Sequence, residues 1–352
     1  MISYVAVNNF KGLKDFQLED MSRLTLLSGR NNVGKSSILE AMFLYRDHVS
    51  SDSFNKLHIF RGNNVNGTSG IWDPFFYGMN TSEPIVIKFV DEEIRGELKY
   101  SRDDSYLPNN ITGIPENVLA TFRSANKEAY SLKFDFKEGE YMEEGHFSTS
   151  GAGTLRDLKT SLEGNEIRLG KATQINNSVS VRIQNNVVDG ISKLEMDGRK
   201  KDLIDVLRQI DSTMEDVITL SVAGEPKLYA RINNCLVPLH QAGDGLIKLL
   251  TISVAVMTMK DGLLLIDEIE NGFHYSMYGK LWNIVDELSK ITNCQIVATT
   301  HSYELITSTI GNIKAEQDFS YYRIGKIEEK TSSYRYDYSM LCDAASAEME
   351  VR

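Results

Sequence analysis

The sequence predicts an α/β fold in which a largely parallel sheet carries helices on its faces. After Asp211, apolar strand-like segments alternate with amphipathic helix-like segments, a pattern typical of parallel sheets. Before residue 30, short segments alternate apolar and polar side chains, which indicates antiparallel strands. Between these parts, residues 27–41 read "LSGRNNVGKSSILEA", a glycine-containing loop between an apolar strand and a helix.

Size and composition suit a folded globular protein. The chain has 352 residues, 41% hydrophobic and 25% charged, which is enough for one large domain or two moderate ones. The first residues lack the zones of a signal peptide, and the longest apolar run, 249–259, is too short to cross a bilayer. We therefore expect a cytoplasmic protein with no membrane partner. The three cysteines have no paired spacing, so we expect free buried thiols rather than disulfides or a zinc site.

The charge balance argues against strong nucleic-acid binding. The formal net charge is -11, so the surface as a whole should repel DNA, RNA and anionic membranes. The best basic cluster is Arg199, Lys200 and Lys201, but aspartates flank it and a solvated loop is the favoured interpretation. Nucleic-acid contact is therefore expected to be local and weak.

The elements can be assigned in chain order. Residues 1–30 predict two or three strands, and a helix begins at about Ser36. Residues 50–80 are rich in Asn, Gly, Ser and aromatic side chains and predict a structured loop region, followed by a strand-like segment at 84–100. Residues 101–210 are more polar, and we interpret them as an insertion or lateral subdomain.

Within the insertion, the patterns predict strands at 129–136 and 178–184 and a helix at 199–210. From Asp211 onward, strands at 217–224, 227–232, 262–267 and 294–300 alternate with helices at 245–259 and 276–291. No repeat of 20 to 50 residues is visible, and no heptad pattern is long enough for a coiled coil.

The glycine loop matches the phosphate-binding pattern G-x-x-x-x-G-K-[ST] with Gly29, Gly34, Lys35 and Ser36. Glycine suits a backbone that curls around phosphate oxygens with positive φ. The following helix start would point partial positive charge at the anion, Lys35 would reach the β and γ phosphates, and Ser36 would coordinate magnesium. Since the pattern lies between a strand and a helix, as this chemistry requires, we interpret it as a nucleotide site.

A second acidic element follows the apolar strand "GLLLI". Asp267 is placed to enter a Mg²⁺ shell, and Glu268 is placed to polarise an attacking water. An acidic helix start would explain the same residues through the helix dipole. Combined with the glycine loop, however, the catalytic interpretation is favoured.

Two further loops follow the same logic. His301 follows the strand "CQIVATT", and because carboxyl ends of parallel strands share an edge, it could lie beside Glu268 and sense the γ phosphate. A capping or surface histidine is the alternative. Gly243, Asp244 and Gly245 precede an apolar helix, which makes a second helix N-terminus able to hold an anion, although the segment alone also fits an ordinary turn.

These segments together resemble the ABC-type ATPases of the OLD and RecF-like group, AAA family ATPases common in bacterial defence loci. The resemblance covers about residues 1–50 and 235–310. Residues 8–43 are similar to that group's N-terminal signature, 266–282 to its Walker B and following loop, and "ATTHS" to its switch histidine. "AGDGLIKLL" is similar to its shortened ABC signature and departs from the Leu-Ser-Gly-Gly-Gln form of transporters.

The resemblance implies a P-loop ATPase head over residues 1–352, with an N-terminal lobe at 1–90, an inserted subdomain at 91–210 and a C-terminal lobe at 211–352. It implies ATP and Mg²⁺ as cofactors, with two ATPs sandwiched in a head-to-tail homodimer. Asp267 and Glu268 would serve metal and water, and His301 would be the switch. The signature residues Gly243, Asp244 and Gly245 would reach the opposing subunit's ATP. The phosphates would be held by Gly29, Arg30, Asn31, Asn32, Val33, Gly34, Lys35, Ser36 and Ser37.

Two differences from related ATPases reduce the number of functions that the sequence allows. The stretch between Lys35 and Asp267 has no coiled coil, unlike SMC-type tethers, and the residues after His301 lack the Asp-x-Asp pair of a Toprim nuclease. We therefore expect an ATPase that serves as sensor or scaffold for a separately encoded effector in anti-phage defence. The alternative is a RecF-like ATPase that clamps or repairs DNA. The acidic charge favours the first.

Overall fold

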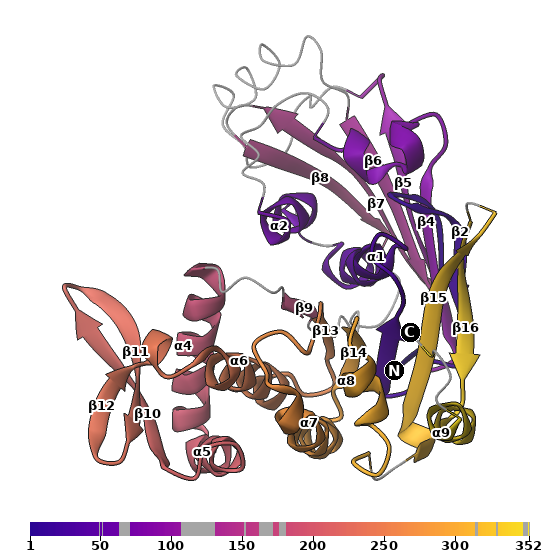
Figure 1. Ribbon diagram of the computed structural model, residues 1–352. Coiled ribbons are helices and arrows are strands. Elements are labelled where there is room, and N and C mark those ends of the chain that lie inside the picture. The colour runs from indigo at the N-terminus through magenta and orange to yellow at the C-terminus, as the bar shows by residue number, and fades with distance from the viewer. Residues whose placement is uncertain are drawn as a thin grey trace. The chain divides into compact units, whose positions relative to one another are not determined.

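The structure is a computed structural model that describes residues 1–48, 50, 52–62, 71–106, 131–150, 153–161, 172–175, 181–313, 316–328, 330–347 and 351. The chain divides into two compact units. Figure 1 colours the ribbon by residue number and labels the helices and strands. The division splits the predicted insertion, since its residues up to 170 fall in unit 1 and the rest in unit 2. The predicted lobe boundaries stay a prediction. Unit 1 comprises Met1–Met21, Arg30–Gly170 and Ile324–Tyr334, and unit 2 comprises Ser22–Gly29, Lys171–Arg323 and Arg335–Arg352.

Unit 1 is built on a seven-stranded sheet in the order β2-β1-β4-β5-β6-β7-β8. The pairings are antiparallel, which confirms the antiparallel strands predicted at the N-terminus. Burial alternates along the strands, as in a sheet with one face in the core. The elements are β1 (Ile2–Phe10), β2 (Leu13–Leu18), α1 (Lys35–Asp47), α2 (Ser53–Phe60), β4 (Ile85–Asp91), β5 (Ile94–Asp103), β6 (Ser131–Glu138), β7 (Tyr141–Ser150) and β8 (Gly153–Ser161).

Aromatic side chains fill the core of unit 1. Phe89 on β4 pairs with Gly96 on β5, and a Cβ at Gly96 would lie 1.9 Å from Cζ of the Phe89 ring. Only glycine therefore lets this ring lie flat over the neighbouring strand. Tyr45 of α1 contacts the Phe89 ring and stacks on Phe136, so these rings attach the helix that follows the phosphate loop to the sheet.

Unit 2 contains most of a six-stranded sheet in the order β16-β15-β3-β14-β13-β9. The pairs around β3, β13 and β14 are parallel, which confirms the predicted α/β fold with a largely parallel sheet. Strands β3 and β13 are buried along their whole length, and β13 is a continuous apolar run, because helices cover parallel sheets. Its strands are β3 (Leu24–Ser28), β9 (Ala172–Ile175), β13 (Leu263–Ile266), β14 (Gln295–Thr299), β15 (Phe319–Ile327) and β16 (Lys330–Tyr336), the last two divided between the units.

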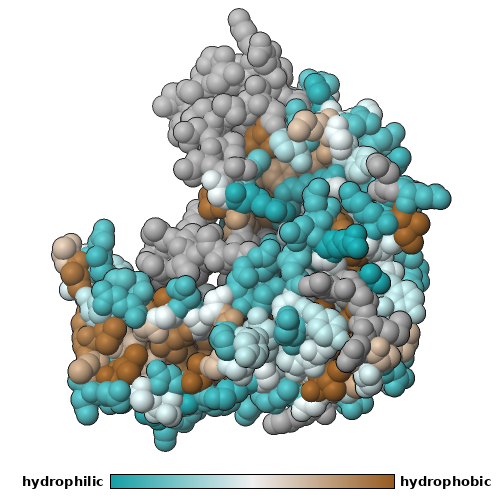
Figure 2. All heavy atoms as spheres, viewed as in Figure 1, coloured by the Kyte–Doolittle hydropathy of each residue, from teal (hydrophilic) through white to brown (hydrophobic). Residues whose placement is uncertain are grey.

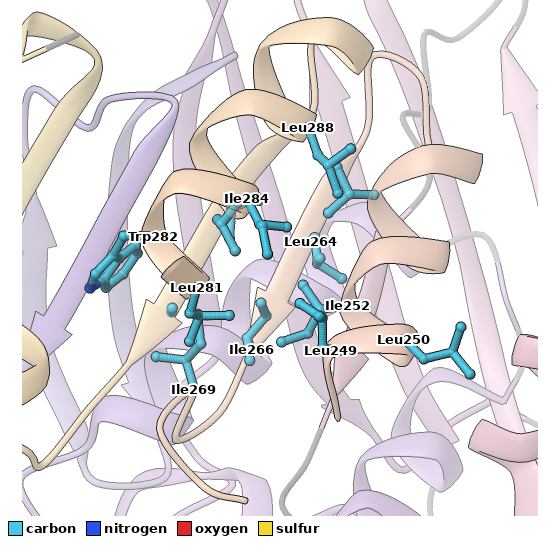
Figure 3. Packing of buried hydrophobic residues seen from close by; sticks show 14 of the residues in the cluster. Leu249, Leu250, Ile252, Leu264, Ile266, Ile269, Leu281, Trp282, Ile284 and Leu288 are labelled. Carbon is cyan, nitrogen blue, oxygen red and sulfur yellow. The ribbon is translucent and has the colours of Figure 1, made fainter. Parts of the chain in front are cut away.

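Two helices pack their apolar faces against β13 in the core of unit 2. Figure 3 shows Leu249 and Ile252 of one helix beside Leu264 of the strand. Leu281 and Ile284 of the other helix pack against the same strand. Burying such side chains contributes roughly 1.5–3 kcal/mol each. The helices of this unit are α4 (Val181–Met196), α5 (Lys200–Arg208), α6 (Asp244–Thr258), α7 (Tyr278–Thr292), α8 (Tyr303–Thr307) and α9 (Tyr338–Ser346).

A small antiparallel sheet of β10 (Met214–Val222), β11 (Glu225–Ile232) and β12 (Cys235–Pro238) completes unit 2. The strand predicted at 178–184 is wrong where it can be compared, because helix α4 begins at Val181. Alternating valines and isoleucine favoured a strand locally. The continuation, however, buries Val187, Ile191 and Leu194 at helical spacing, so packing decides for the helix.

The expectations about membrane-spanning helices and about the cysteines can be compared with the structure. No helix of the described residues is both long and apolar enough to traverse a membrane. All three cysteines are free thiols, but only Cys294 is buried, and burial raises its pKa to about 12. Cys235 is exposed, so the expectation that the thiols are buried is wrong for that residue.

A buried ion-pair cluster fixes α1 within unit 1. Glu40 of α1 has no exposed surface, and its carboxylate lies 2.6 Å from Lys11 Nζ and 2.6 Å from Arg61 Nε. Burial lowers the pKa of Lys11, while the Glu40 carboxylate opposes that shift. The cluster thus ties the phosphate-loop helix to the β1–β2 turn and to the end of α2.

Glu40→Gln should lower the free energy of unfolding by about 3 kcal/mol, because Arg61 and half-buried Lys11 lose the buried countercharge that they share. Urea denaturation measures this loss. The matched control is Glu97→Gln, which removes an exposed partner 3.5 Å from Lys88 and should change stability by less than about 0.5 kcal/mol. Equal, small effects of the two substitutions would contradict the role of the buried cluster.

Candidate functional site

The predicted phosphate loop is curled by three residues with left-handed backbone. Gly29, Asn32 and Gly34 have φ values of 138°, 63° and 105°. Gly34 is the N-cap of α1, so the loop leads directly into a helix N-terminus, where backbone N–H groups attract anions. The loop therefore has the backbone that the glycine pattern predicts for phosphate binding.

Close contacts in unit 1 hold the end of this loop. A Cβ on Gly34 would lie 2.9 Å from Leu13 Cδ2, and the Thr331 hydroxyl donates to the Val33 carbonyl at 3.1 Å. Lys35 is buried, and its Nζ donates to the Arg30 carbonyl at 3.0 Å. The ammonium thus lies against its own loop. Of the other predicted residues, Arg30, Asn31 and Asn32 are exposed, Val33 and Ser37 are buried, and Ser36 is half-buried.

The other predicted residues gather at one edge of the parallel sheet in unit 2. Ile266, the last residue of β13, pairs with Ala298 of β14, which in turn pairs with Leu26 of β3. The Thr300 N–H donates to the Leu27 carbonyl at 2.9 Å. The carboxyl ends of the three strands therefore share an edge, as parallel pairing predicts, and the first residue of the phosphate loop, Gly29, continues from the same edge.

Thr299 fastens the acidic loop to the end of β14. Its buried hydroxyl donates to Asp267 Oδ1 at 2.6 Å and accepts from the Glu268 N–H at 2.8 Å. The Ile269 N–H adds a bond to the Thr299 carbonyl at 3.0 Å. Three successive residues after β13 are thus held by one threonine, and this arrangement fixes the orientation of the Asp267 carboxylate.

Glu268 adopts a strained backbone that turns its side chain toward the predicted switch residue. Its φ is 49°, in the left-handed region that costs non-glycine residues of order 1 kcal/mol. Its Oε1 lies 3.6 Å from His301 Nε2, and each side chain is 32% exposed. The structure therefore brings Asp267, Glu268 and His301 together, as the strand-end argument anticipated.

Two neighbours that the sequence argument did not single out complete this cluster. The Asn271 side-chain amide donates to Glu268 Oε2 at 2.7 Å. Glu270 Oε1 accepts from the His301 N–H at 2.6 Å. The sequence offered one signal for these residues, the mostly polar segment "DEIEN" directly after a buried strand. Which of its side chains face the site depends on the turn that follows Glu268.

The signature-like loop lies beside the turn after the acidic residues. Gly243 is the N-cap of α6, with φ of 94°, and both Gly243 and Asp244 are exposed. A Cβ on Gly245 would lie 2.9 Å from the Gly272 carbonyl oxygen, so only glycine allows this approach of helix and turn. Within unit 2, the start of α6 therefore touches the segment that begins at Asp267.

The donor set fits magnesium held jointly with a nucleotide. Across the residues that the structure describes, no three His, Cys, Asp or Glu side chains form a metal-ligand group. Magnesium in nucleotide sites uses one or two protein oxygens and completes its shell with phosphate and water oxygens. Asp267 and Ser36 supply oxygens of this kind. Ser36 belongs to unit 1 and Asp267 to unit 2.

The basic cluster is not the solvated loop that its sequence favoured, because Lys200 and Lys201 lie in the first turn of α5. Lys200 Nζ lies 3.0 Å from a carboxylate oxygen of Glu195 and 3.0 Å from one of Asp216. Arg199 donates to the Met257 carbonyl at 3.0 Å. Two of the three cations are thus engaged within the fold, which leaves little charge for phosphate binding.

Known proteins resemble this chain over most of its length. The sequence profile described as "AAA ATPase domain" matches residues 1–306. A Helicobacter pylori protein named "ATP/GTP phosphatase" is 26% identical over 344 residues, which span 91% of this chain and 90% of that protein. The profile match therefore spans both the phosphate loop and the acidic cluster.

Solved structures share the fold at low sequence identity. A SmcHead bound to the C-winged helix domain of ScpA has a TM-score of 0.54 and 10% identity, covering 96% of this chain and 98% of that one. An Smc head domain with an extended coiled coil, bound to the C-terminal domain of ScpA from Pyrococcus furiosus, has a TM-score of 0.51 and 9% identity, with 98% of each chain covered. The chain thus has a P-loop NTPase fold that resembles SMC heads.

Thr299→Val should lower the free energy of unfolding by about 2 kcal/mol, because the Asp267 carboxylate and the Glu268 N–H lose their buried partner while the side-chain shape is kept. Chemical denaturation at neutral pH measures the loss. Thr299→Ser retains the hydroxyl and should retain most of the stability. If the valine variant unfolds at the wild-type denaturant concentration, the hydroxyl does not fasten the acidic loop.

Proposed function

The chain belongs to the AAA ATPase domain family, and we propose that it binds ATP between two copies of its head and acts as a sensor or scaffold for a separately encoded effector in anti-phage defence. The coarser assignment, an ATPase with an SMC-like, ABC-type fold, follows from the comparisons. The observation that carries the proposal is the Asp267, Glu268 and His301 cluster, because a protein that only binds nucleotide has no use for a positioned second carboxylate.

The phosphate loop has the role of binding and orienting ATP. Gly29 to Ser37 would wrap the phosphates with backbone N–H groups, and Lys35 would exchange its contact with the Arg30 carbonyl for one with the β and γ phosphates. The curled backbone at Gly29, Asn32 and Gly34 supports this role. Magnesium, when bound, would neutralise phosphate charge, and the Ser36 hydroxyl and the Asp267 carboxylate would hold it.

Glu268 has the role of orienting the attacking water. Its Oε2 is held by Asn271 and its Oε1 faces His301, so the carboxylate has a fixed direction before substrate arrives. A preoriented carboxylate can accept a proton from water without reorganising at the moment of reaction. We assign to His301, whose backbone N–H is bonded to Glu270, the role of sensing the γ phosphate.

The signature-like loop has its role in a second copy of the chain. Gly243, Asp244 and Gly245 lie at an exposed helix N-terminus, which suits an anion supplied by a partner. We assign them to the opposing subunit's ATP, so that the active form is a head-to-tail homodimer with two nucleotides. This loop touches the turn at Gly272. Binding of the partner's ATP to the loop would therefore also shift the acidic loop of the same subunit.

The proposed effector partner rests on the surface and its charge. The net charge is -11 and Lys200 is paired with acids, so a phosphate backbone is a poor ligand. Figure 2 shows apolar side chains gathered over the region of the three-stranded sheet, where Leu220, Val222 and Leu236 are exposed. Exposed apolar patches suit protein contacts. These features favour a protein effector over the alternative of a RecF-like DNA clamp.

Glu268→Gln should bind ATP with wild-type affinity and hydrolyse it roughly 100-fold more slowly, because the amide cannot accept the proton of the attacking water. Calorimetry and a phosphate-release assay measure the two quantities. The matched variant is Lys35→Ala, which should lose ATP binding altogether through the missing charge on the β and γ phosphates. Wild-type turnover by the glutamine variant, or wild-type ATP affinity of the alanine variant, would refute the assigned roles.

Coexpression with the product of the neighbouring gene should yield a stable complex, whereas the isolated chain should cut neither DNA nor RNA. Its binding to duplex DNA should be weak and should vanish as salt rises, because few phosphates can be neutralised. Size-exclusion chromatography and fluorescence anisotropy measure these properties. DNA cleavage that persists in Asp267→Ala and Glu268→Ala preparations would exclude the separate effector, and tight, salt-resistant DNA binding would favour the DNA clamp.

A further inference from the structure

A half-buried lysine of the signature-like helix has its ammonium shielded from solvent. Lys248 is on α6, one turn beyond Asp244 and Gly245, which begin that helix. Its Nζ is shielded from solvent and has no hydrogen-bond partner among the described residues. An ammonium in such a place is costly unless negative charge compensates it. The position of Lys248 therefore requires an electrostatic explanation.

The compensating charge comes from the loop after β13. Burial lowers the pKa of Lys248, and the carboxylates of Glu270, Asp267 and Glu268 oppose that shift, with Glu270 acting most strongly. Glu270 Oε2 is itself buried and, within the described part of the chain, has no hydrogen-bond partner. Gly245, one turn before Lys248, approaches the Gly272 carbonyl oxygen closely, so this part of α6 lies against the segment that carries Glu270. A buried ammonium and a buried carboxylate oxygen thus lie on two segments that pack together.

Glu270 passes this interaction on to the switch residue. Its other oxygen, Oε1, accepts from the His301 N–H at 2.6 Å, and His301 Nε2 lies 3.6 Å from Glu268. The Glu270 carboxylate therefore holds the His301 backbone with one oxygen, while its other oxygen is buried and available to the Lys248 ammonium. Any force that turns this carboxylate also moves His301 relative to Glu268.

We propose that Lys248 is a positioning residue, whose ammonium pairs with Glu270 and so couples the signature-like helix α6 to the placement of His301 beside Glu268. The inference rests on the proposed function for its catalytic consequence. Because α6 begins at the loop assigned to the partner's ATP, the pair would transmit engagement of the second subunit to the hydrolytic residues of the first. The long, flexible lysine stem allows the pair to close through a small shift of α6.

The test is a double-mutant cycle with Lys248→Met, which keeps the length of the stem, and Glu270→Gln, which keeps an acceptor for the His301 N–H. Lys248→Met should lower kcat roughly 10-fold and leave KM for ATP within about twofold, because the lysine acts on the hydrolytic residues rather than on nucleotide binding. Lys248→Arg, which restores the charge, should recover most of kcat. The exposed Lys260→Met, just beyond the same helix, serves as the control and should match wild type.

The same double-mutant cycle also measures the interaction between Lys248 and Glu270 through the stability of the protein, without ATP. The unfolding constant of the double variant should be at least ~5-fold smaller than the product of the two single effects predicts, because removing both charges leaves neither one buried alone. Additive effects on unfolding would overturn the pair, and wild-type kcat in Lys248→Met would overturn its positioning role. If wild-type protein fails to hydrolyse ATP while the unfolding cycle shows coupling, the proposed function fails and the charge pair stands.

Discussion

The arrangement of the candidate site depends on the Thr299 hydroxyl, which bonds the side chain of Asp267 and the backbone of Glu268 at once. The strands before these residues are buried and parallel, so they deliver the acidic loop and Thr299 to one edge of the sheet. Parallel pairing alone leaves the side chains free to rotate. The threonine converts a shared edge into a fixed carboxylate, and it does so without a charge that would compete with the magnesium or the phosphates.

The residues around this contact carry backbone strain and buried charges that an ordinary turn would not have. Glu268 has a left-handed φ, and Gly245 lies so close to the Gly272 carbonyl that a side chain at Gly245 would clash. The Lys248 ammonium and one carboxylate oxygen of Glu270 are buried. Each feature constrains the residues next to it, and all lie within one short stretch of unit 2. Strain of this kind persists where the surroundings impose it, which is the situation of preorganised catalytic groups.

Much of the fold and part of the site could be predicted from the sequence because those signals are local. The phosphate loop is written in one contiguous pattern, and the approach of His301 to Glu268 follows from strand order. The roles of Asn271, Glu270 and Lys248 could not be predicted, because they depend on the direction of a single turn and on packing between α6 and the acidic loop. The strand expected at 178–184 failed for a related reason, since the burial of Val187 and Ile191 belongs to a helix that only the tertiary contacts select.

We propose that the acidic loop after β13 and the phosphate loop hold one metal ion together with ATP. The affinity of Mn²⁺ in the presence of ATP, measured by electron paramagnetic resonance in wild type, Ser36→Ala and Asp267→Asn, tests it directly. We predict that each substitution weakens the ternary Mn²⁺ complex by at least ~10-fold, because each removes an oxygen from the same shell. Wild-type Mn²⁺ affinity in the Asp267→Asn variant would contradict the claim.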